Sequence, residues 1–317
     1  AIMVLNRHQN RFDLYFANPR STLCKVAIRD EAPQYIKEQA YANIEFFDKN
    51  IVMMSERDGY NHLYLYTIGG NLVKQITKGD FEVKDFLGWD QNANVFYYTS
   101  NEESPLRTAV YKIDAKGKKT KLSTRVGTNS AIFSHSMKYY INTYSSISTP
   151  TRITINNNQG KELKTLMDNA ALKEKVARLN MPIKEFFTFT TSDGVKLNGW
   201  MMKPANFNPN KKYPVIMHQY SGPGSQQVID RWNIGSFSDG GMFEAYMCDK
   251  GFVMVCVDGR GTGGRGAAFE KCTYMFLGVK EAKDQVETAK YLGTLPFVDK
   301  NKIGIWGWSF GGYTTLM

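Results

Sequence analysis

The stretch Ile303-Gly304-Ile305-Trp306-Gly307-Trp308-Ser309-Phe310-Gly311-Gly312-Tyr313 decides the fold of the C-terminal part of this 317-residue chain. Its centre, Gly307–Gly311, matches G-x-S-x-G, the pattern of an elbow in which a sharp strand-to-helix turn exposes a serine hydroxyl. Such a turn is strained and crowded, so it requires small residues around the serine, and the motif supplies them. Ser309 is therefore a candidate nucleophile.

The sequence before the elbow supplies the context that the motif requires. The apolar runs Val215–Met217 and Phe252–Val257 predict strands, and the second is of the type buried on both faces. Between Glu281 and Leu292, apolar residues recur at helical spacing on one face, which predicts a helix. Strand, helix and strand in this order favour a right-handed crossover and an α/β-hydrolase domain.

A serine hydroxyl needs a base to take its proton, and in this fold the acid and then the histidine follow the serine in the chain. The four histidines all precede Ser309: His8, His62, His135 and His218. We therefore expect the triad Asp and His beyond Met317, and the chain to be an internal piece of a larger serine hydrolase. Asp258 also precedes the serine, so we expect Asp258 and Arg260 to form a structural turn at a strand end.

The first half of the chain repeats itself. Apolar segments begin at residues 2, 51, 95 and 139, and each is followed by a second alternating segment and a shorter third one. β-branched and aromatic alternation broken by polar turns predicts antiparallel strands, and a period of about 40–50 residues is typical of β-propeller blades. The W-D and G-H signatures of WD40 blades are missing from the sequence, and an irregular β-sandwich is the alternative. Further blades are expected before Ala1.

Three regions follow from these patterns. Residues 1–167 are predicted to be the C-terminal part of a β-propeller, and residues 168–192 a connecting segment with a short helix capped by Asp168 or Asn169. Residues 193–317 are predicted to be the N-terminal part of an α/β-hydrolase domain, truncated after the elbow. A hairpin around residues 192–194 is expected to join the last two regions.

Composition excludes several classes of function. The net charge is +10, but the densest lysine run, Lys116–Lys121, lies in a polar turn between strands, so nucleic-acid binding is not expected. The four cysteines show no metal-binding spacing, and we expect neither a metal nor a cofactor. Pairing of Cys248 with Cys272 stays open, and Cys256 is expected to be a buried thiol. No stretch of 18 apolar residues predicts a membrane span.

Four segments resemble one family. Gly307-Trp308-Ser309-Phe310-Gly311-Gly312-Tyr313 is similar to the nucleophile motif G-W-S-Y-G-G-Y of the dipeptidyl peptidase IV branch of the prolyl oligopeptidase family, above all its bacterial members. Asp258–Gly263 resembles the D-G-R-G-[ST]-G turn of that branch, and Gln219–Gln226 resembles its Y-[AS]-G-P-x-S-Q segment. Ser55–Tyr60 resembles a propeller segment. The match runs in order along the chain.

The resemblance implies roles for individual residues. Ser309 would be the acylating nucleophile, and Tyr220 would donate one hydrogen bond to the oxyanion through its neutral hydroxyl. The second oxyanion donor would be the backbone N–H of Phe310, the residue after the nucleophile. Phe310 replaces the usual tyrosine, which removes any contact of that hydroxyl. The two propeller glutamates that bind the free amino terminus of a substrate would lie before Ala1.

The function that the resemblance implies is a serine exopeptidase that releases X-Pro or X-Ala dipeptides from peptide N-termini through an acyl-enzyme at Ser309. Its substrates would be peptides with Pro or Ala second from the N-terminus. The full-length protein would be a homodimer located in the periplasm, at the cell surface or outside the cell. Alternatives are an oligopeptidase or acylaminoacyl peptidase of the same clan, or a non-catalytic propeller–hydrolase interaction protein. The isolated fragment is expected to be inactive.

Overall fold

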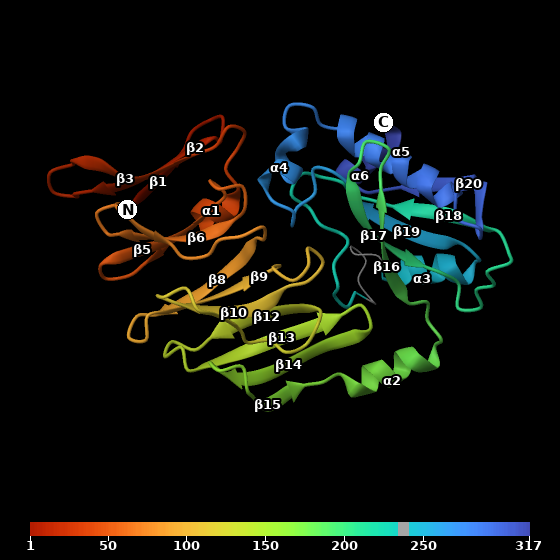
Figure 1. The fold of residues 1–317 in the computed structure, drawn as a ribbon, viewed down its shortest axis with the longest axis horizontal. Coiled ribbons are helices and arrows are strands. Elements are labelled where there is room, and N and C mark those ends of the chain that lie inside the picture. Colours follow the sequence, from red (N-terminus) through yellow and green to blue (C-terminus); the bar gives the residue numbers. More distant parts are fainter. Residues whose placement is uncertain (234–240) are drawn as a thin grey trace.

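Four antiparallel sheets follow one another in the N-terminal half of the computed structural model, which describes residues 1–233 and 241–317 (Figure 1). The first sheet has three strands: β1 Ile2–Leu5, β2 Arg11–Ala17 and β3 Cys24–Glu31. The second holds β4 Glu45–Phe46, β5 Asn50–Ser55, β6 His62–Thr67 and β7 Leu72–Gln75, after the short helix α1 Glu38–Ala42. The third holds β8 Val83–Asp90, β9 Val95–Ser100, β10 Ala109–Asp114 and β11 Lys119–Lys121. The fourth holds β12 Thr128–Phe133, β13 Tyr139–Ser146, β14 Thr149–Asn157 and β15 Glu162–Met167.

These sheets are successive propeller blades that pack face to face. Strand β5 shows why, because both of its faces are buried. Ile51 and Met53 pack with Phe12 and Leu14 of the first sheet, whereas Val52 and Met54 pack in a cluster with Phe96 and Tyr98 of the third. Side chains alternate between the two faces of a strand, so a run of apolar residues lets one sheet fill the space between two neighbours. The expected propeller blades are confirmed.

The sequence repeat predicted three strands in each unit, and the structure has a fourth strand in three of the sheets. The added strands are the first of their sheets: β4, β8 and β12. Strand β12, with the sequence Thr-Asn-Ser-Ala-Ile-Phe, shows why they were missed, since its start is polar and its alternation is weak. Four strands per sheet is the usual composition of a propeller blade.

The C-terminal half forms one five-stranded sheet in the order β16-β17-β19-β18-β20. Strand β18 runs parallel to β19 and β20, and β16, β17 and β19 are antiparallel neighbours. The strands are β16 Lys184–Thr190, β17 Lys196–Met202, β18 Tyr213–His218, β19 Val253–Asp258 and β20 Val298–Trp306. The helices are α2 Ala170–Arg178, α3 Met242–Asp249, α4 Ala267–Glu270, the 3-10 turn η1 Lys271–Thr273, α5 Val279–Gly293 and α6 Phe310–Leu316.

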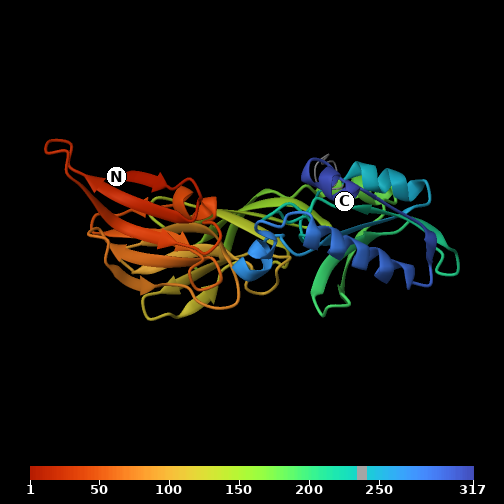
Figure 2. The same cartoon turned by 90° about the horizontal axis from the view of Figure 1, so that it is seen from above.

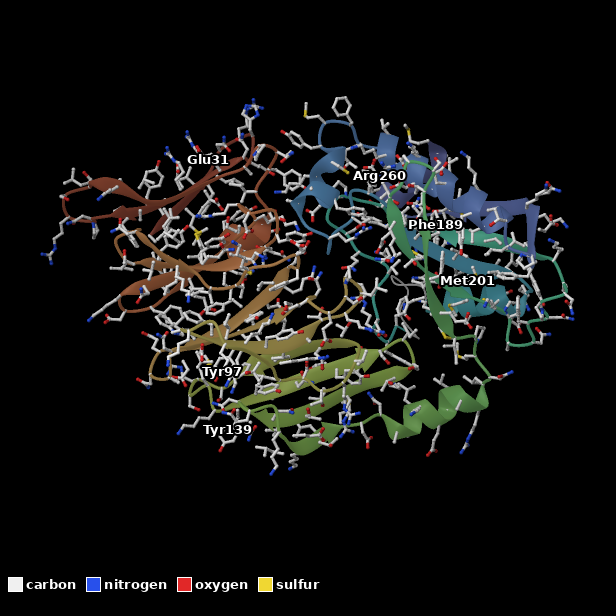
Figure 3. All side chains as sticks on the ribbon, in the orientation of Figure 1. Glu31, Tyr97, Tyr139, Phe189, Met201 and Arg260 are labelled. Carbon is white, nitrogen blue, oxygen red and sulfur yellow. The ribbon has the colours of Figure 1, made fainter. Side chains whose placement is uncertain are left out.

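Helices cover both faces of this sheet, and β19 lies at its centre. Val253, Val255 and Val257 pack in the cluster that includes Leu292 of α5, whereas Met254 and Cys256 pack with Ala245 of α3. The prediction of a strand buried on both faces is confirmed. Figure 3 shows Phe189 and Met201, two members of the first cluster, on the sheet.

Several local predictions can be compared with the structure. Helix α5 and the hairpin of β16 with β17 are confirmed, and the Asp168 carboxylate accepts a hydrogen bond from the amide of Ala170 at the start of α2. Strand β16 lies inside the predicted connecting segment 168–192 and forms an edge of the five-stranded sheet, while the division into three regions stays a prediction.

Cys248 and Cys272 are both free thiols. Within the described ranges, no helix is both long and apolar enough to cross a membrane.

The blades and the five-stranded sheet lie side by side and meet along loops (Figure 2). From the hydrolase half, the segment between β19 and η1 reaches the blades, where the amide of Ala267 donates to the carbonyl oxygen of Gly59. A second junction is formed by Asp230, whose carboxylate accepts hydrogen bonds from Arg107 and from the amide of Ile147. The elbow lies in the hydrolase half of the molecule, at the end of β20.

Candidate active site

The candidate nucleophile sits on a strained turn between β20 and α6. Ser309 has φ 55° and ψ −117°, a combination that non-glycine residues rarely adopt. Strand β20 ends at Trp306, and α6 begins at Phe310, immediately after the serine. Ser309 is exposed, as the nucleophile of this motif must be to reach a substrate. The strand–turn–helix context predicted for the motif is confirmed.

The glycines on each side of Ser309 allow the turn to approach the end of β18. A Cβ atom on Gly307 would lie 2.5 Å from the carbonyl oxygen of Gln219, and a Cβ atom on Gly311 would overlap the same oxygen. Both distances are far inside van der Waals contact, so a side chain at either position would push the turn away. The two glycines therefore bring the elbow against the residue that precedes Tyr220.

Gln219 ties the two segments together. Its side-chain amide donates to the carbonyl oxygen of Gly311 at 2.6 Å and to the hydroxyl of Thr315 at 3.1 Å, both on α6. Its backbone amide donates to the carbonyl oxygen of Trp306 at 3.2 Å, which continues the parallel pairing of β18 with β20. Gln219 is 1% exposed. Gln219 was not predicted as a site residue, although it opens the segment Gln219–Gln226 that carries the resemblance.

Tyr220 is the next residue and lies beside the elbow. Its ring centroid is 6.4 Å from that of Phe310, and Phe310 in turn packs edge to face against Tyr313 at 5.4 Å. The chain turns away at Ser221, which has φ 60°. A Cβ atom on Gly222 would lie 2.5 Å from the Tyr220 ring, so the ring packs directly against this glycine. The structure thus brings the three predicted residues Ser309, Phe310 and Tyr220 into one corner.

This corner holds two kinds of hydrogen-bond donor suited to an oxyanion. Phe310 is the first residue of α6, and the N–H groups in the first turn of a helix lack acceptors within the helix. Tyr220 adds a phenol, which donates a hydrogen bond without adding a charge. Donors held in place before a negative charge develops stabilise that charge at little reorganisation cost. The arrangement suits acyl transfer.

Asp258 has a structural role, as expected. Its carboxylate accepts hydrogen bonds from the amide of Val228 at 2.8 Å and from the amide of Gln227 at 3.0 and 3.1 Å. Burial raises the pKa of Asp258 to about 6, although these amides act in the opposite direction. The carboxylate therefore fastens the loop after Tyr220 to the end of β19.

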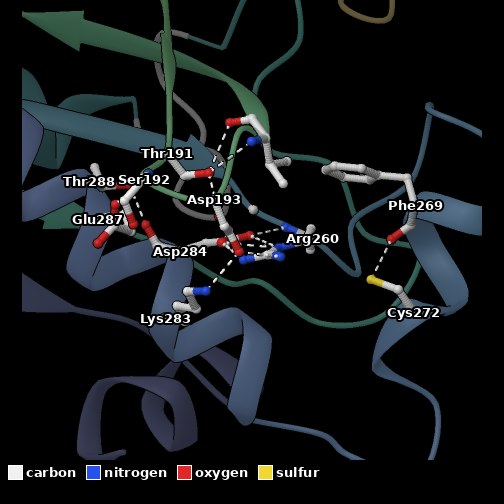
Figure 4. A network of polar contacts seen from close by, with 12 residues as sticks. Thr191, Ser192, Asp193, Arg260, Phe269, Cys272, Lys283, Asp284, Glu287 and Thr288 are labelled. Atoms are coloured by element: carbon white, nitrogen blue, oxygen red, sulfur yellow. Dashed lines mark hydrogen bonds and ion pairs between the residues drawn. The ribbon is translucent and has the colours of Figure 1, made fainter.

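Arg260 is the centre of a second network, at the start of α5 (Figure 4). Its guanidinium binds the carboxylate of Asp284, which is 0% exposed, with Nη2 2.6 Å from Oδ1, and its backbone amide donates to Oδ2 at 2.7 Å. Nη1 also lies 3.0 Å from Asp193 Oδ2, which Lys283 binds at 2.7 Å. These pairs join the turn of the β16–β17 hairpin to α5 and the Arg260 turn, so Arg260 is structural too.

Metal ligation finds no support in the part of the chain that the structure describes, where no three His, Cys, Asp or Glu side chains gather as a metal site.

Comparisons with known proteins show which family the chain resembles. Residues 1–151 match the family model described as the dipeptidyl peptidase IV N-terminal region, and residues 241–317 match that of the prolyl oligopeptidase family. A probable dipeptidyl peptidase 4 of Aspergillus flavus is 35% identical over 271 residues, covering 84% of this chain. Dipeptidyl peptidase 4 of Trichophyton tonsurans is 35% identical over 274 residues, covering 83%.

Solved structures agree as well. The crystal structure of Porphyromonas gingivalis dipeptidyl peptidase 4 matches 99% of this chain with a TM-score of 0.94 and 47% identity. A putative dipeptidyl aminopeptidase IV from Bacteroides ovatus matches 99% with a TM-score of 0.86 and 31% identity. The chain spans 35% and 34% of the lengths of the two fungal relatives, and 44% and 47% of the two bacterial chains.

Proposed function

Because the chain belongs to the dipeptidyl peptidase IV branch of the prolyl oligopeptidase family, we propose that the whole protein is a serine exopeptidase. It releases dipeptides with Pro or Ala in the second position from the amino termini of peptides. The observation that carries the proposal is the corner in which the strained Ser309 turn is held against the Tyr220 segment by Gln219.

The reaction follows from these positions. The Ser309 hydroxyl oxygen attacks the carbonyl carbon of the second residue of the substrate, and its proton passes to the triad histidine that we place beyond Met317. The carbonyl oxygen becomes an oxyanion that accepts hydrogen bonds from the Phe310 amide and the Tyr220 hydroxyl. The C–N bond then breaks, the leaving amine takes the proton from the histidine, and a dipeptidyl ester stays on Ser309. Water hydrolyses the ester and frees the dipeptide.

The test uses the full-length protein and Ser309→Ala. Wild-type protein should hydrolyse Gly-Pro-p-nitroanilide, and the variant should lose at least about 1,000-fold in kcat, since removing a triad member forfeits most of the catalytic effect. Its thermal unfolding should stay near that of the wild type. Turnover that survives the exchange would refute the role of Ser309.

A second substrate distinguishes the related activities. Acetyl-Gly-Pro-p-nitroanilide lacks the free amino terminus, so the proposed exopeptidase should hardly cleave it. Preferred cleavage of the blocked substrate would favour an acylaminoacyl peptidase or oligopeptidase instead. No turnover of either substrate by folded wild-type protein would favour a non-catalytic interaction protein.

We also propose, on family grounds alone, that the whole protein is exported and forms a homodimer. Cell fractionation should find it in the periplasm, on the cell surface or in the medium, and light scattering should give the mass of two chains. A cytoplasmic fraction or a monomeric mass would contradict these two proposals separately.

A further inference from the structure

The hydrolase loop between β19 and α4 is held by buried polar groups of the third blade. The carboxylate of Glu82 accepts a hydrogen bond from the amide of Gly266 at 2.8 Å, and the side-chain amide of Asn101 donates to the carbonyl oxygen of Gly264 at 2.7 Å. Glu82 is 2% exposed and Asn101 is 4% exposed. Buried hydrogen bonds of this kind are costly to break, because the groups left behind lose their partners without gaining water.

Glu82 and Asn101 act as one unit. The amide of Glu82 donates to the side-chain oxygen of Asn101 at 2.7 Å, so the amide side chain is fixed from both ends. Burial acts to raise the pKa of Glu82, but the ammonium groups of Lys84 and Lys37 and the Gly266 amide outweigh it and hold that pKa below its usual range. Glu82 is therefore ionised, and hydrogen bonds to an ionised acceptor are the stronger kind.

The loop that these residues hold also carries the segment after Tyr220. The amide of Gly224 donates to the carbonyl oxygen of Gly261 at 2.9 Å, and the amide of Gly263 donates to that of Ser225 at 2.8 Å. The two backbones are so close that a Cβ atom on Gly263 would lie 2.6 Å from the oxygen of Gly224. Any displacement of the loop must therefore displace this segment.

The segment in turn sets the position of the Tyr220 ring. Ser221 turns the chain with φ 60°, and the Tyr220 ring packs so closely against Gly222 that a Cβ atom there would have no room. A third tie from the blade reaches the same segment, since the side-chain amide of Gln226 donates to the carbonyl oxygen of Pro105 at 2.7 Å. The contacts thus run without a break from the third blade to the phenol.

We propose that Glu82 and Asn101 are positioning residues for the oxyanion donor Tyr220, so that the propeller sets the geometry of the catalytic corner. The inference rests on the proposed acyl transfer at Ser309. Because the hydroxyl of Tyr220 acts on the oxyanion, which exists only during the reaction, loosening its support should lower kcat and leave KM nearly unchanged.

The experiment is a double-mutant cycle in the full-length protein with Gly-Pro-p-nitroanilide. We expect Glu82→Ala to lower kcat about tenfold, since small displacements in an active site have effects of this order or larger. In a Tyr220→Phe background, the same exchange should change kcat less than about twofold, because the group it positions is already missing. Glu82→Gln keeps an oxygen that can accept from Gly266 and should restore part of kcat.

Two further variants complete the test. Asn101→Asp keeps the oxygen that accepts from the Glu82 amide but removes the donor to Gly264. It should therefore also lower kcat about tenfold, and it tests the same connection if Glu82→Ala fails to fold. Asp13→Ala is the matched control, because Asp13 is a buried carboxylate of a blade, 2% exposed, that pairs with Arg29 of the next strand. It should leave kcat within about twofold of the wild type.

The outcomes separate the two proposals. Equal losses of kcat in the wild-type and Tyr220→Phe backgrounds, or an effect on KM alone, would overturn the positioning role while Ser309→Ala still abolished turnover. Retained turnover in Ser309→Ala would instead refute the proposed function itself.

Discussion

Gln219 and Gly311 are joined by a hydrogen bond of 2.6 Å from the side-chain amide of the first to the carbonyl oxygen of the second. Gly311 also has no room for a side chain, because a Cβ atom there would overlap the carbonyl oxygen of Gln219. Gln219 therefore fixes the position of α6 both through this hydrogen bond and through the close contact of its carbonyl oxygen. The separation between the serine turn and the Tyr220 segment depends on this pair.

Gly311→Ala should lower kcat for Gly-Pro-p-nitroanilide by at least about 100-fold in the full-length protein, since the new methyl group must push the elbow away from Tyr220. Gly304→Ala is the control, because a Cβ atom at that position in β20 would lie 4.0 Å from the carbonyl oxygen of Val215, an ordinary contact. Steady-state kinetics of both variants check the prediction. Equal activities would show that the close approach has no catalytic role.

Tyr220→Phe should lower kcat by about 100-fold and change KM less than about twofold, because it keeps the ring against Phe310 and Gly222 and removes only the donor to the oxyanion. Tyr213→Phe is a matched control. This exchange likewise removes one phenolic hydroxyl. The hydroxyl of Tyr213 accepts a hydrogen bond from the amide of Asn208 at 2.9 Å in the hydrolase core. Similar kinetics for the two variants would count against an oxyanion role for Tyr220.

Sequence patterns predicted the elements whose cause is local. The apolar runs of β5 and β19, the alternation in β6 and the helical spacing of α5 each depend on residues within one element, and all four elements form. The elbow belongs to the same class, since its glycines and serine specify a turn. Strands such as β12 have little pattern of their own and form because a neighbouring strand offers hydrogen-bond partners.

Contacts between distant segments could not be predicted in the same way. Glu82 and Gly266 are 184 positions apart, and neither residue carries a motif that points to the other. Gln219 stands next to the predicted Tyr220, yet its tie to α6 depends on how β18 and β20 pair. The sequence therefore indicated the candidate groups of the site, whereas the structure shows which contacts hold their segments together.

Arg260→Ala should lower the free energy of unfolding by about 3–5 kcal/mol, because it leaves the fully buried carboxylate of Asp284 without its cation. Arg260→Lys should recover only part of the loss, since one ammonium cannot reproduce the forked pairing. Lys283→Ala is the control, because its side chain is 49% exposed and its ion pair with Asp193 contributes little. Urea unfolding followed by tryptophan fluorescence gives the comparison. A loss as small as that of Lys283→Ala would contradict this view of the network.

The stability of the protein should depend on pH through Asp258. Burial raises the pKa of Asp258 in the folded protein to about 6, above its ordinary value of 3.8, so the folded state binds the proton more tightly than the unfolded state does. This contribution to stability is fully present below the unfolded pKa and is lost as the pH rises through about 6. Asp258→Asn cannot titrate, and its altered hydrogen bonds with the Gln227 and Val228 amides add an offset that does not depend on pH.

The unfolding free energy of Asp258→Asn should therefore improve relative to the wild type between pH 4 and pH 7.5, by up to about 3 kcal/mol. Urea unfolding at several pH values measures the difference, and Asp249→Asn, which removes an exposed carboxylate at the end of α3, serves as the control. If the curves of wild type and Asp258→Asn run parallel across this range, the carboxylate is held equally well in both charge states. The amides of Gln227 and Val228 would then offset the whole effect of burial.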